Sequence, residues 1–221
     1  MLLSQQAGLT AAPFSGRILP TMDNNNLNDR INRARERLRF QFKILLGCAL
    51  LLWAILFVNT FLLGNSLLYF GVRPREIEGL WGILFMPFLH ATAAHAAANT
   101  LPFLTLGWLV MARRTADFFV VSGIIMLIGG VGVWLLGPGG TVHVGASGLV
   151  FGYFGFLLLR GYFERSFTAV FISFLVILFN GGMLWGVLPQ QGTTISWQGH
   201  LFGFIGGGYA AFVLSRQSYR Q

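Results

Sequence analysis

Six long apolar segments constrain this chain more than any other feature of its sequence. They cover residues 40–63, 91–111, 118–136, 147–159, 167–187 and 197–214. Five have the length that a helix needs to cross a bilayer, and the fourth is shorter. Hydrophobic residues make up 55% of the 221-residue chain and charged residues only 10%, which is too apolar for a soluble domain. The sequence predicts an all-α integral membrane protein with six transmembrane helices.

The positive charges predict the orientation of these helices. The formal net charge is +8. Arginines precede the first segment and follow the second, fourth and sixth, whereas Arg73 and Arg75 on the opposite side are offset by Glu76 and Glu78. The positive-inside bias then places both termini in the cytoplasm, and we expect a bacterial cytoplasmic membrane. No basic stripe interleaved with aromatics occurs on a soluble domain, so the charge does not indicate nucleic acid.

Three parts are expected along the chain. Residues 1–39 form a polar, basic tail that is disordered or lies on anionic lipid headgroups. Either Met1 or Met22 is the natural start of the chain. Residues 40–215 form the membrane domain, and residues 216–221 a short cytoplasmic tail. The long first outer loop, residues 65–89, mixes aromatic and charged side chains, which predicts structure in the membrane interface.

Four polar residues lie at a similar depth in the predicted bilayer. Counted from the basic end of each segment at 1.5 Å per residue, Ser147 lies about 20 Å and His200 about 24 Å deep. Asn99 and His95 lie about 21 Å and about 27 Å deep by the same arithmetic. Polar side chains are costly in hydrocarbon, so a group at one level is a candidate functional site.

The residue types in this group suit acyl transfer. Ser147 begins the fourth helix, where unpaired N–H groups and the positive end of the helix dipole favour an oxyanion. His95 and Asn99 are four residues apart, so they share one helix face and can donate to the same group. The seven carboxylates all lie at other levels, which favours a Ser147–His200 dyad with the histidine as general base and then general acid.

Neither a metal nor a cofactor is expected. The sequence has no HExxH motif, and His90 and His95, five residues apart, fall on different helix faces. Cys48, the single cysteine, lies in an apolar run and forms no intrachain disulfide.

Small residues on the fourth and sixth segments predict close helix packing around the dyad. Gly145 and Gly148 flank the serine, and Gly199 and Gly203 flank His200, so two glycine-lined faces can bring these helices together. Phe151 lies one turn after the serine, where its ring can stack on the imidazole.

The stretches "HATAAHAAAN", "GASG" and "GHLFGFIGGG" resemble the three signatures of rhomboid intramembrane serine proteases, in the same order. The resemblance covers about residues 40–214 and implies a six-helix rhomboid-type bundle that cleaves transmembrane protein substrates. It implies that Ser147 is the nucleophile and His200 its base. It also implies that His95, Asn99 and the Ser147 N–H form the oxyanion hole, with a structural role for His90.

The sequence departs from the family in two places. Well-studied bacterial members carry Trp-Arg in the first outer loop, where this chain has Trp81 followed by Gly82, and often have tyrosine where Phe151 stands. The first departure leaves the anchoring of the loop open, and the second removes a hydroxyl but keeps the ring. We also expect His143, four residues before the serine, to be a solvated loop histidine.

The fifth segment predicts how a substrate reaches the serine. Asn180, Gly181 and Gly182 interrupt it near the level of the site, and glycine pairs allow helices to bend. We expect its outer part and the loop at 188–198 to move aside and admit a substrate helix laterally. The alternative is that these glycines only permit tight packing.

Two other functions remain open beside a serine endopeptidase. A rhomboid-like pseudoenzyme would bind transmembrane helices without cutting them, although inactive relatives typically lack the serine or the histidine. A small-solute transporter would show broken helices and repeat symmetry, which this sequence lacks. The substrate and the oligomeric state stay undefined.

Overall fold

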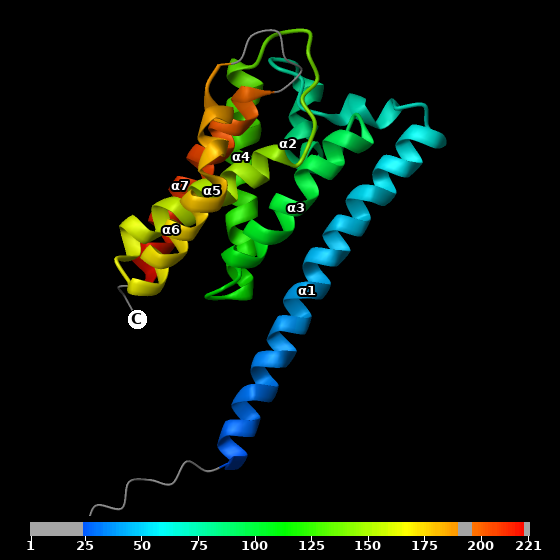
Figure 1. The fold of residues 1–221 in the computed structure, drawn as a ribbon. Coiled ribbons are helices and arrows are strands. Elements are labelled where there is room, and N and C mark those ends of the chain that lie inside the picture. The colour runs from blue at the N-terminus through cyan, green and yellow to red at the C-terminus, as the bar shows by residue number, and fades with distance from the viewer. Residues whose placement is uncertain (1–23, 190–195, 219–221) are drawn as a thin grey trace, which may run out of the picture. The chain divides into compact units, whose positions relative to one another are not determined.

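A computed structural model describes residues 24–189 and 196–218. These residues are helical apart from connecting loops and one isolated antiparallel bridge between Val72 and His143. Six of the helices each overlap one predicted apolar segment, which confirms the all-α class (Figure 1). They are α1 (Asn24–Phe61), α3 (Ala93–Val110), α4 (Thr115–Leu136), α5 (Ser147–Glu164), α6 (Phe167–Asn180) and α7 (Trp197–Ser218).

Fewer than six of the described helices are long and apolar enough to count as membrane spans. Three helical segments pass both criteria, and a fourth span results if Ile77–Phe88 and Ala93–Val110, bent by 68°, are counted as one. The three are Asn26–Phe61, Thr115–Leu136 and Phe167–Val187. Arg160 and Glu164 lower the hydropathy of α5, and glycines and polar residues lower that of α7. The six-span count stays a prediction.

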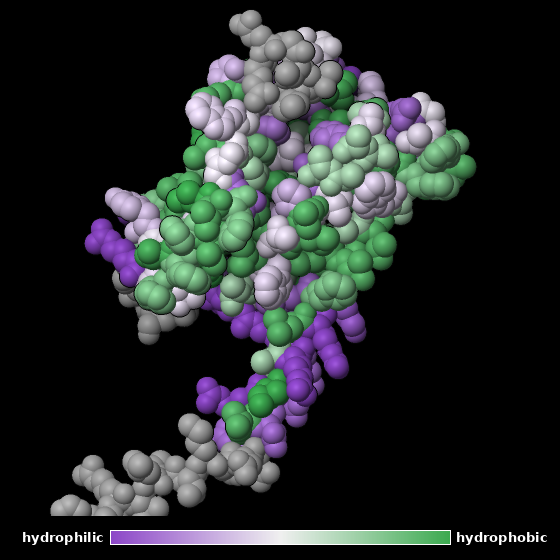
Figure 2. Space-filling view, viewed as in Figure 1, coloured by the Kyte–Doolittle hydropathy of each residue, from purple (hydrophilic) through white to green (hydrophobic). Residues whose placement is uncertain are grey.

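Apolar side chains cover much of the surface. Figure 2 shows them over most of the visible face of the helical bundle. On α6, Phe167 is 86% exposed and Phe179 is 78% exposed. Exposed apolar surface of this extent is typical of a protein that lies in a membrane.

The chain divides into two compact units, Met1–Leu38 and Arg39–Gln221. In the first unit the chain is helical from Asn24 onward, within the stretch that the sequence predicts as a disordered or interfacial tail. Residues 1–23 of that tail lie outside the described residues. At the other end, α7 continues to Ser218, into the predicted C-terminal tail.

Helix α5 lies at the centre of the second unit and packs directly against α7. A Cβ atom on Gly203 would meet the carbonyl oxygen of Gly148, and one on Gly207 would meet the carbonyl oxygen of Gly152. The backbones of the two helices therefore touch, as the glycine pattern predicts. Farther along α5, Tyr153 is fully buried in the apolar core.

Four short helical elements form the segment between α1 and α3. They are η1 (Ser66–Phe70), η2 (Ile77–Trp81), α2 (Gly82–Phe85) and η3 (Met86–Phe88). The backbones of Val72 and His143 exchange hydrogen bonds of 3.0 and 2.9 Å, and Arg75 Nη1 donates to the carbonyl oxygen of Gly137 at 2.8 Å. These contacts attach the segment to the loop that precedes Ser147.

Close packing within this segment explains the glycine at position 82. A Cβ atom on Gly82 would collide with the backbone of Gly71 and Val72. An arginine does not fit there without moving that backbone. Arg73 and Arg75 supply cationic side chains to this segment instead, and the Arg73 guanidinium lies 3.9 Å from the centroid of the Tyr69 ring.

Candidate active site

One cavity of about 670 Å³ brings together three of the four predicted catalytic side chains. His95 from α3, Ser147 from α5 and His200 from α7 all line it, although they are separated by more than 50 residues along the chain. Ser147 is half-buried and His200 is buried. Together with His143, which also lines it, the cavity thus places one candidate serine hydroxyl and three imidazoles in a partly enclosed space.

A tight turn positions Ser147 at the beginning of α5. Gly145 has a φ of +119°, a conformation that side-chain-bearing residues rarely adopt. A Cβ atom there would lie 2.6 Å from Cε1 of His95, so the turn also requires the absence of a side chain. The N–H of Gly145 donates to the carbonyl oxygen of Met86 at 2.9 Å. Ser147 follows as the first residue of α5, whose first N–H groups have no acceptor within the helix.

A backbone carbonyl orients His200. Its Nδ1 lies 3.0 Å from the carbonyl oxygen of Gly186, and a carbonyl oxygen can only accept, so Nδ1 carries the hydrogen. Nε2 is then the ring nitrogen with the free lone pair. The ring of Phe151 stacks on the imidazole with centroids 3.9 Å apart and planes 6° apart, so the predicted stacking is present.

Gly186 is a site residue that the sequence analysis missed. It lies in η4 (Gly181–Val187), the 3-10 continuation of α6. A Cβ atom there would lie 2.5 Å from Cζ of Phe151 and 3.5 Å from Nδ1 of His200. Only a glycine lets the backbone approach both rings. Its one sequence signal was its position, in the outer half of the fifth segment.

Asn99 is not among the described residues that line the cavity. Its Nδ2 is 3.1 Å from the carbonyl oxygen of His95 and 3.3 Å from Nε2 of His90. The N–H of Ala146 also donates to His90 Nε2, at 3.2 Å. His90 therefore ties α3 to the turn before the serine, and Asn99 supports the same connection.

His143 is not the solvated loop histidine that was expected. It is only 7% exposed and lines the cavity. Thr141 donates its hydroxyl hydrogen to Pro138 O at 2.7 Å, so it accepts from Nε2 of His143 at 2.8 Å. The hydroxyl of Ser196 lies 2.7 Å from Nδ1, which then accepts. Burial lowers the pKa of His143 and stabilises this neutral form.

The fold and its apolar surface define a helical membrane protein. A sequence profile described as Rhomboid domain matches residues 78–217, more than half of the chain. The chain belongs to the rhomboid family.

Relatives fall in bacteria and plants. An uncharacterized protein of Mycobacterium leprae is 36% identical over 220 residues, which cover 95% of this chain and 87% of that protein. An uncharacterized protein of Mycobacterium tuberculosis is 43% identical over 159 residues, 69% of this chain, and the match spans 66% of that relative's length. Rhomboid protease GluP of Bacillus subtilis is 30% identical over 159 residues, 68% of this chain and 30% of GluP. Family membership supports an intramembrane protease at the level of the family.

Proposed function

We propose that this protein is an intramembrane serine endopeptidase that hydrolyses peptide bonds in or near transmembrane helices of protein substrates, using Ser147 and His200. The observation that carries the proposal is the single cavity in which Ser147, at a helix N-terminus, and two histidines from other helices meet. A nucleophile beside a base and oxyanion donors is the arrangement that acyl transfer needs.

The proposed reaction begins with attack of Ser147 Oγ on the carbonyl carbon of the scissile peptide bond. Nε2 of His200 accepts the hydroxyl proton, and a tetrahedral oxyanion forms. The C–N bond then breaks, the same proton passes to the leaving amine, and an acyl-serine remains. Water attacks this ester with His200 again as base, which releases the carboxylic acid and restores Ser147.

The carbonyl of Gly186 takes the place that an acid occupies in a triad. It fixes Nδ1–H, so that Nε2 is the basic nitrogen, and Phe151 holds the plane of the ring. A neutral carbonyl stabilises the imidazolium less than a carboxylate does. The oxyanion donors therefore carry a larger share of the rate enhancement.

The proposed oxyanion hole consists of the Ser147 N–H, His95 and Asn99. His95 lies against Gly145, two residues before the serine, which supports its role as a donor. Asn99 can reach the oxyanion only if its Nδ2 gives up the contact with His95 O or His90 Nε2. Its contribution thus combines donation with support of the turn.

Substrate access is proposed to occur through movement of η4. The α-helix ends at Asn180, where the predicted interruption lies, and continues as the 3-10 segment. A Cβ atom on Gly182 would meet nothing within 4 Å, and one on Gly181 would make only an ordinary contact at 3.7 Å. Tight packing therefore does not require these glycines, which favours a hinge. The favoured substrates are single-span helices with an easily unwound outer end and small residues at the cut.

The proposed setting is the bacterial cytoplasmic membrane, with both termini cytoplasmic and residues 65–89 as the first outer loop. Six helices within the 40–215 domain cross the bilayer. The membrane and the substrate helices are the expected partners.

Cleavage of a single-span test substrate by purified protein in liposomes tests the proposal. Ser147→Ala and His200→Ala should each abolish cleavage while the protein still inserts and folds. A helix-binding protein without protease activity, or a transporter, would keep its own activity when the Ser147 hydroxyl is removed. Full cleavage by either variant would rule out the dyad.

A further inference from the structure

A second cavity, of about 420 Å³, lies at the end of α5 opposite Ser147. Its polar lining comes from the chain around the α3–α4 connection, the end of α5 and the beginning of α6. These side chains are Arg113, Arg160, Glu164, Ser166 and Thr168. Arg160 follows Ser147 by thirteen residues on α5, about 20 Å along the helix, so this cavity is separate from the candidate active site.

The guanidinium of Arg160 is buried without full pairing. The residue is only 8% exposed, and its Nε lies 3.0 Å from Oε1 of Glu164. Its Nη1 is inaccessible to solvent and has no hydrogen-bond partner in the part of the chain that the structure describes. A buried charged donor left unpaired is costly, so a rotation of the Arg160 side chain that turns Nη1 toward an acceptor in the cavity would stabilise the fold.

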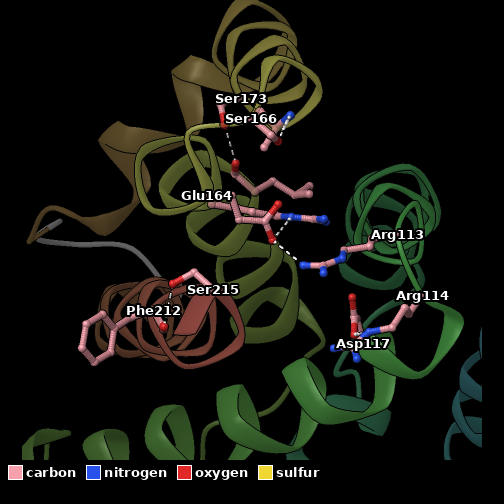
Figure 3. A network of polar contacts seen from close by, with 11 residues as sticks. Arg113, Arg114, Asp117, Glu164, Ser166, Ser173, Phe212 and Ser215 are labelled. Carbon is pink, nitrogen blue, oxygen red and sulfur yellow. Dashed lines mark hydrogen bonds and ion pairs between the residues drawn. The ribbon is translucent and has the colours of Figure 1, made fainter. Parts of the chain in front are cut away.

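Among the described residues that line this cavity, two are arginines and one is a glutamate. Arg113 Nη1 lies 3.2 Å from Oε1 of Glu164, the same oxygen that pairs with Arg160 (Figure 3). One carboxylate thus faces two guanidinium groups. The cavity retains a net attraction for an anion.

The beginning of α6 adds neutral donors on the same side. The hydroxyl of Ser166 caps the helix by accepting from the N–H of Ala169 at 3.2 Å. The other N–H groups of the first turn have no acceptor within the helix, and the positive end of the helix dipole lies there. Thr168, which is exposed, contributes a hydroxyl to the cavity lining.

We infer that this cavity binds a phosphate group, either of a membrane lipid headgroup or as a free anion. Guanidinium groups pair with phosphate oxygens in a fork geometry, and a helix N-terminus supplies backbone donors to the same group. The bound phosphate would connect α5, α6 and the α3–α4 connection through charge-assisted hydrogen bonds. The inference does not depend on the proposed protease activity.

Thermal unfolding of the purified full-length protein in a phosphate-free, non-ionic detergent tests this inference. The probes are inorganic phosphate, dioctanoyl phosphatidic acid and dioctanoylglycerol, each titrated at constant ionic strength. We expect phosphatidic acid to raise Tm saturably by several degrees, because a ligand that binds only the folded state stabilises it. A matching rise with inorganic phosphate identifies a free-anion site, and no rise identifies a headgroup site. An equal rise with dioctanoylglycerol, or no rise with either phosphate probe, overturns the inference.

Two adjacent arginines provide matched variants. Arg113→Gln and Arg114→Gln each remove one positive charge and break an ion pair, that of Arg113 with Glu164 at 3.2 Å and that of Arg114 with Asp117 at 3.0 Å. We expect the concentration for half of the Tm rise to increase at least tenfold in Arg113→Gln and to stay unchanged in Arg114→Gln. Equal responses of the two variants would contradict the inference.

A third variant avoids the risk of unfolding the core at Arg160. Thr168→Glu places a carboxylate in the first turn of α6, where it is favourable for the helix. We expect a higher basal Tm and no further rise with phosphatidic acid, because the new carboxylate occupies the site. An unaltered response to the probe would count against the assignment.

Discussion

Nδ1 of His200 lies 3.0 Å from the carbonyl oxygen of Gly186, and this contact joins the candidate base to the segment proposed to move for substrate access. The two parts of the proposal are therefore linked. When η4 moves outward, His200 loses the acceptor that holds Nδ1–H. Full basicity of Nε2 would return only when the segment closes over the bound substrate.

Replacement of Gly186 tests this orientation. In Gly186→Ala the new methyl group would lie 2.5 Å from Cζ of Phe151, which displaces the carbonyl from Nδ1 or the ring from its stack. We expect kcat to fall by about 100-fold, because small displacements of a catalytic group cost about that much, with little change in KM. Cleavage of an unfolded soluble peptide should fall by the same factor. A normal kcat would mean that the Gly186 contact does not orient the base.

The double variant Gly181→Ala/Gly182→Ala tests the hinge. Neither new methyl group meets a close neighbour, and Gly181 already has helical backbone angles, so the variant should fold normally. It should be more stable by up to about 1 kcal/mol per site through reduced freedom of the unfolded chain. We expect slower cleavage of a transmembrane substrate and unchanged cleavage of a soluble peptide. Equal rates on both substrates, relative to the unmodified protein, would exclude a hinge at this position.

His95→Ala and Asn99→Ala test the oxyanion hole. Each should lower kcat by about 10- to 1000-fold, since removal of one donor to an oxyanion costs up to about 1000-fold. Asn99→Ala should also lower Tm, because it removes the contacts with His90 and the His95 carbonyl, whereas His95→Ala should affect Tm less. The assays are steady-state cleavage and thermal unfolding of the same preparations. Retention of full turnover by both variants would require another source of oxyanion stabilisation.

Because His143 is buried, we expect the folded protein to lose stability in acid. Its pKa is lowered in the folded protein by burial, so the unfolded chain takes up a proton first as the pH falls. The stabilisation is complete above the ordinary pKa of about 6.5 and is lost as the pH falls through the lower folded value. Protonation would also turn Nδ1 into a donor and disrupt the bond from Ser196.

The measurement is Tm against pH for the unmodified protein and His143→Asn, which cannot titrate there. We expect the difference in Tm between the two proteins to shrink between pH 7 and pH 5. The other histidines are common to both proteins, so they cancel in this difference. A constant difference across that range would show that His143 does not contribute to the acid sensitivity.

Much of the architecture could be predicted because hydropathy and residue spacing report it directly. Each of the six apolar segments overlaps one helix, although α1 begins at Asn24, well before its segment, and α6 gives way to η4 at Gly181. The glycines that let α5 and α7 touch were recognisable from their four-residue spacing. The positions of Ser147, His95 and His200 followed from depth, because regular helices convert residue number into height.

The parts that could not be predicted depend on main-chain atoms and on loops. The acceptor for His200 is a carbonyl, which every residue carries, so Gly186 has no distinguishing side chain. His143 is buried because residues distant in sequence, Val72 and Ser196, lie beside it. Such contacts arise from the tertiary fold, and no local pattern indicates them.

Labelling with a fluorophosphonate serine probe, followed by peptide mapping, tests the central claim most directly. The account predicts one adduct, on the peptide that contains Ser147, because this hydroxyl lies at a helix N-terminus and shares its cavity with His200 and His95. The adduct should be absent in Ser147→Ala and form far more slowly in His200→Ala. An adduct on another residue, or none in a preparation that cleaves its substrate, would contradict the assignment of Ser147 as the nucleophile.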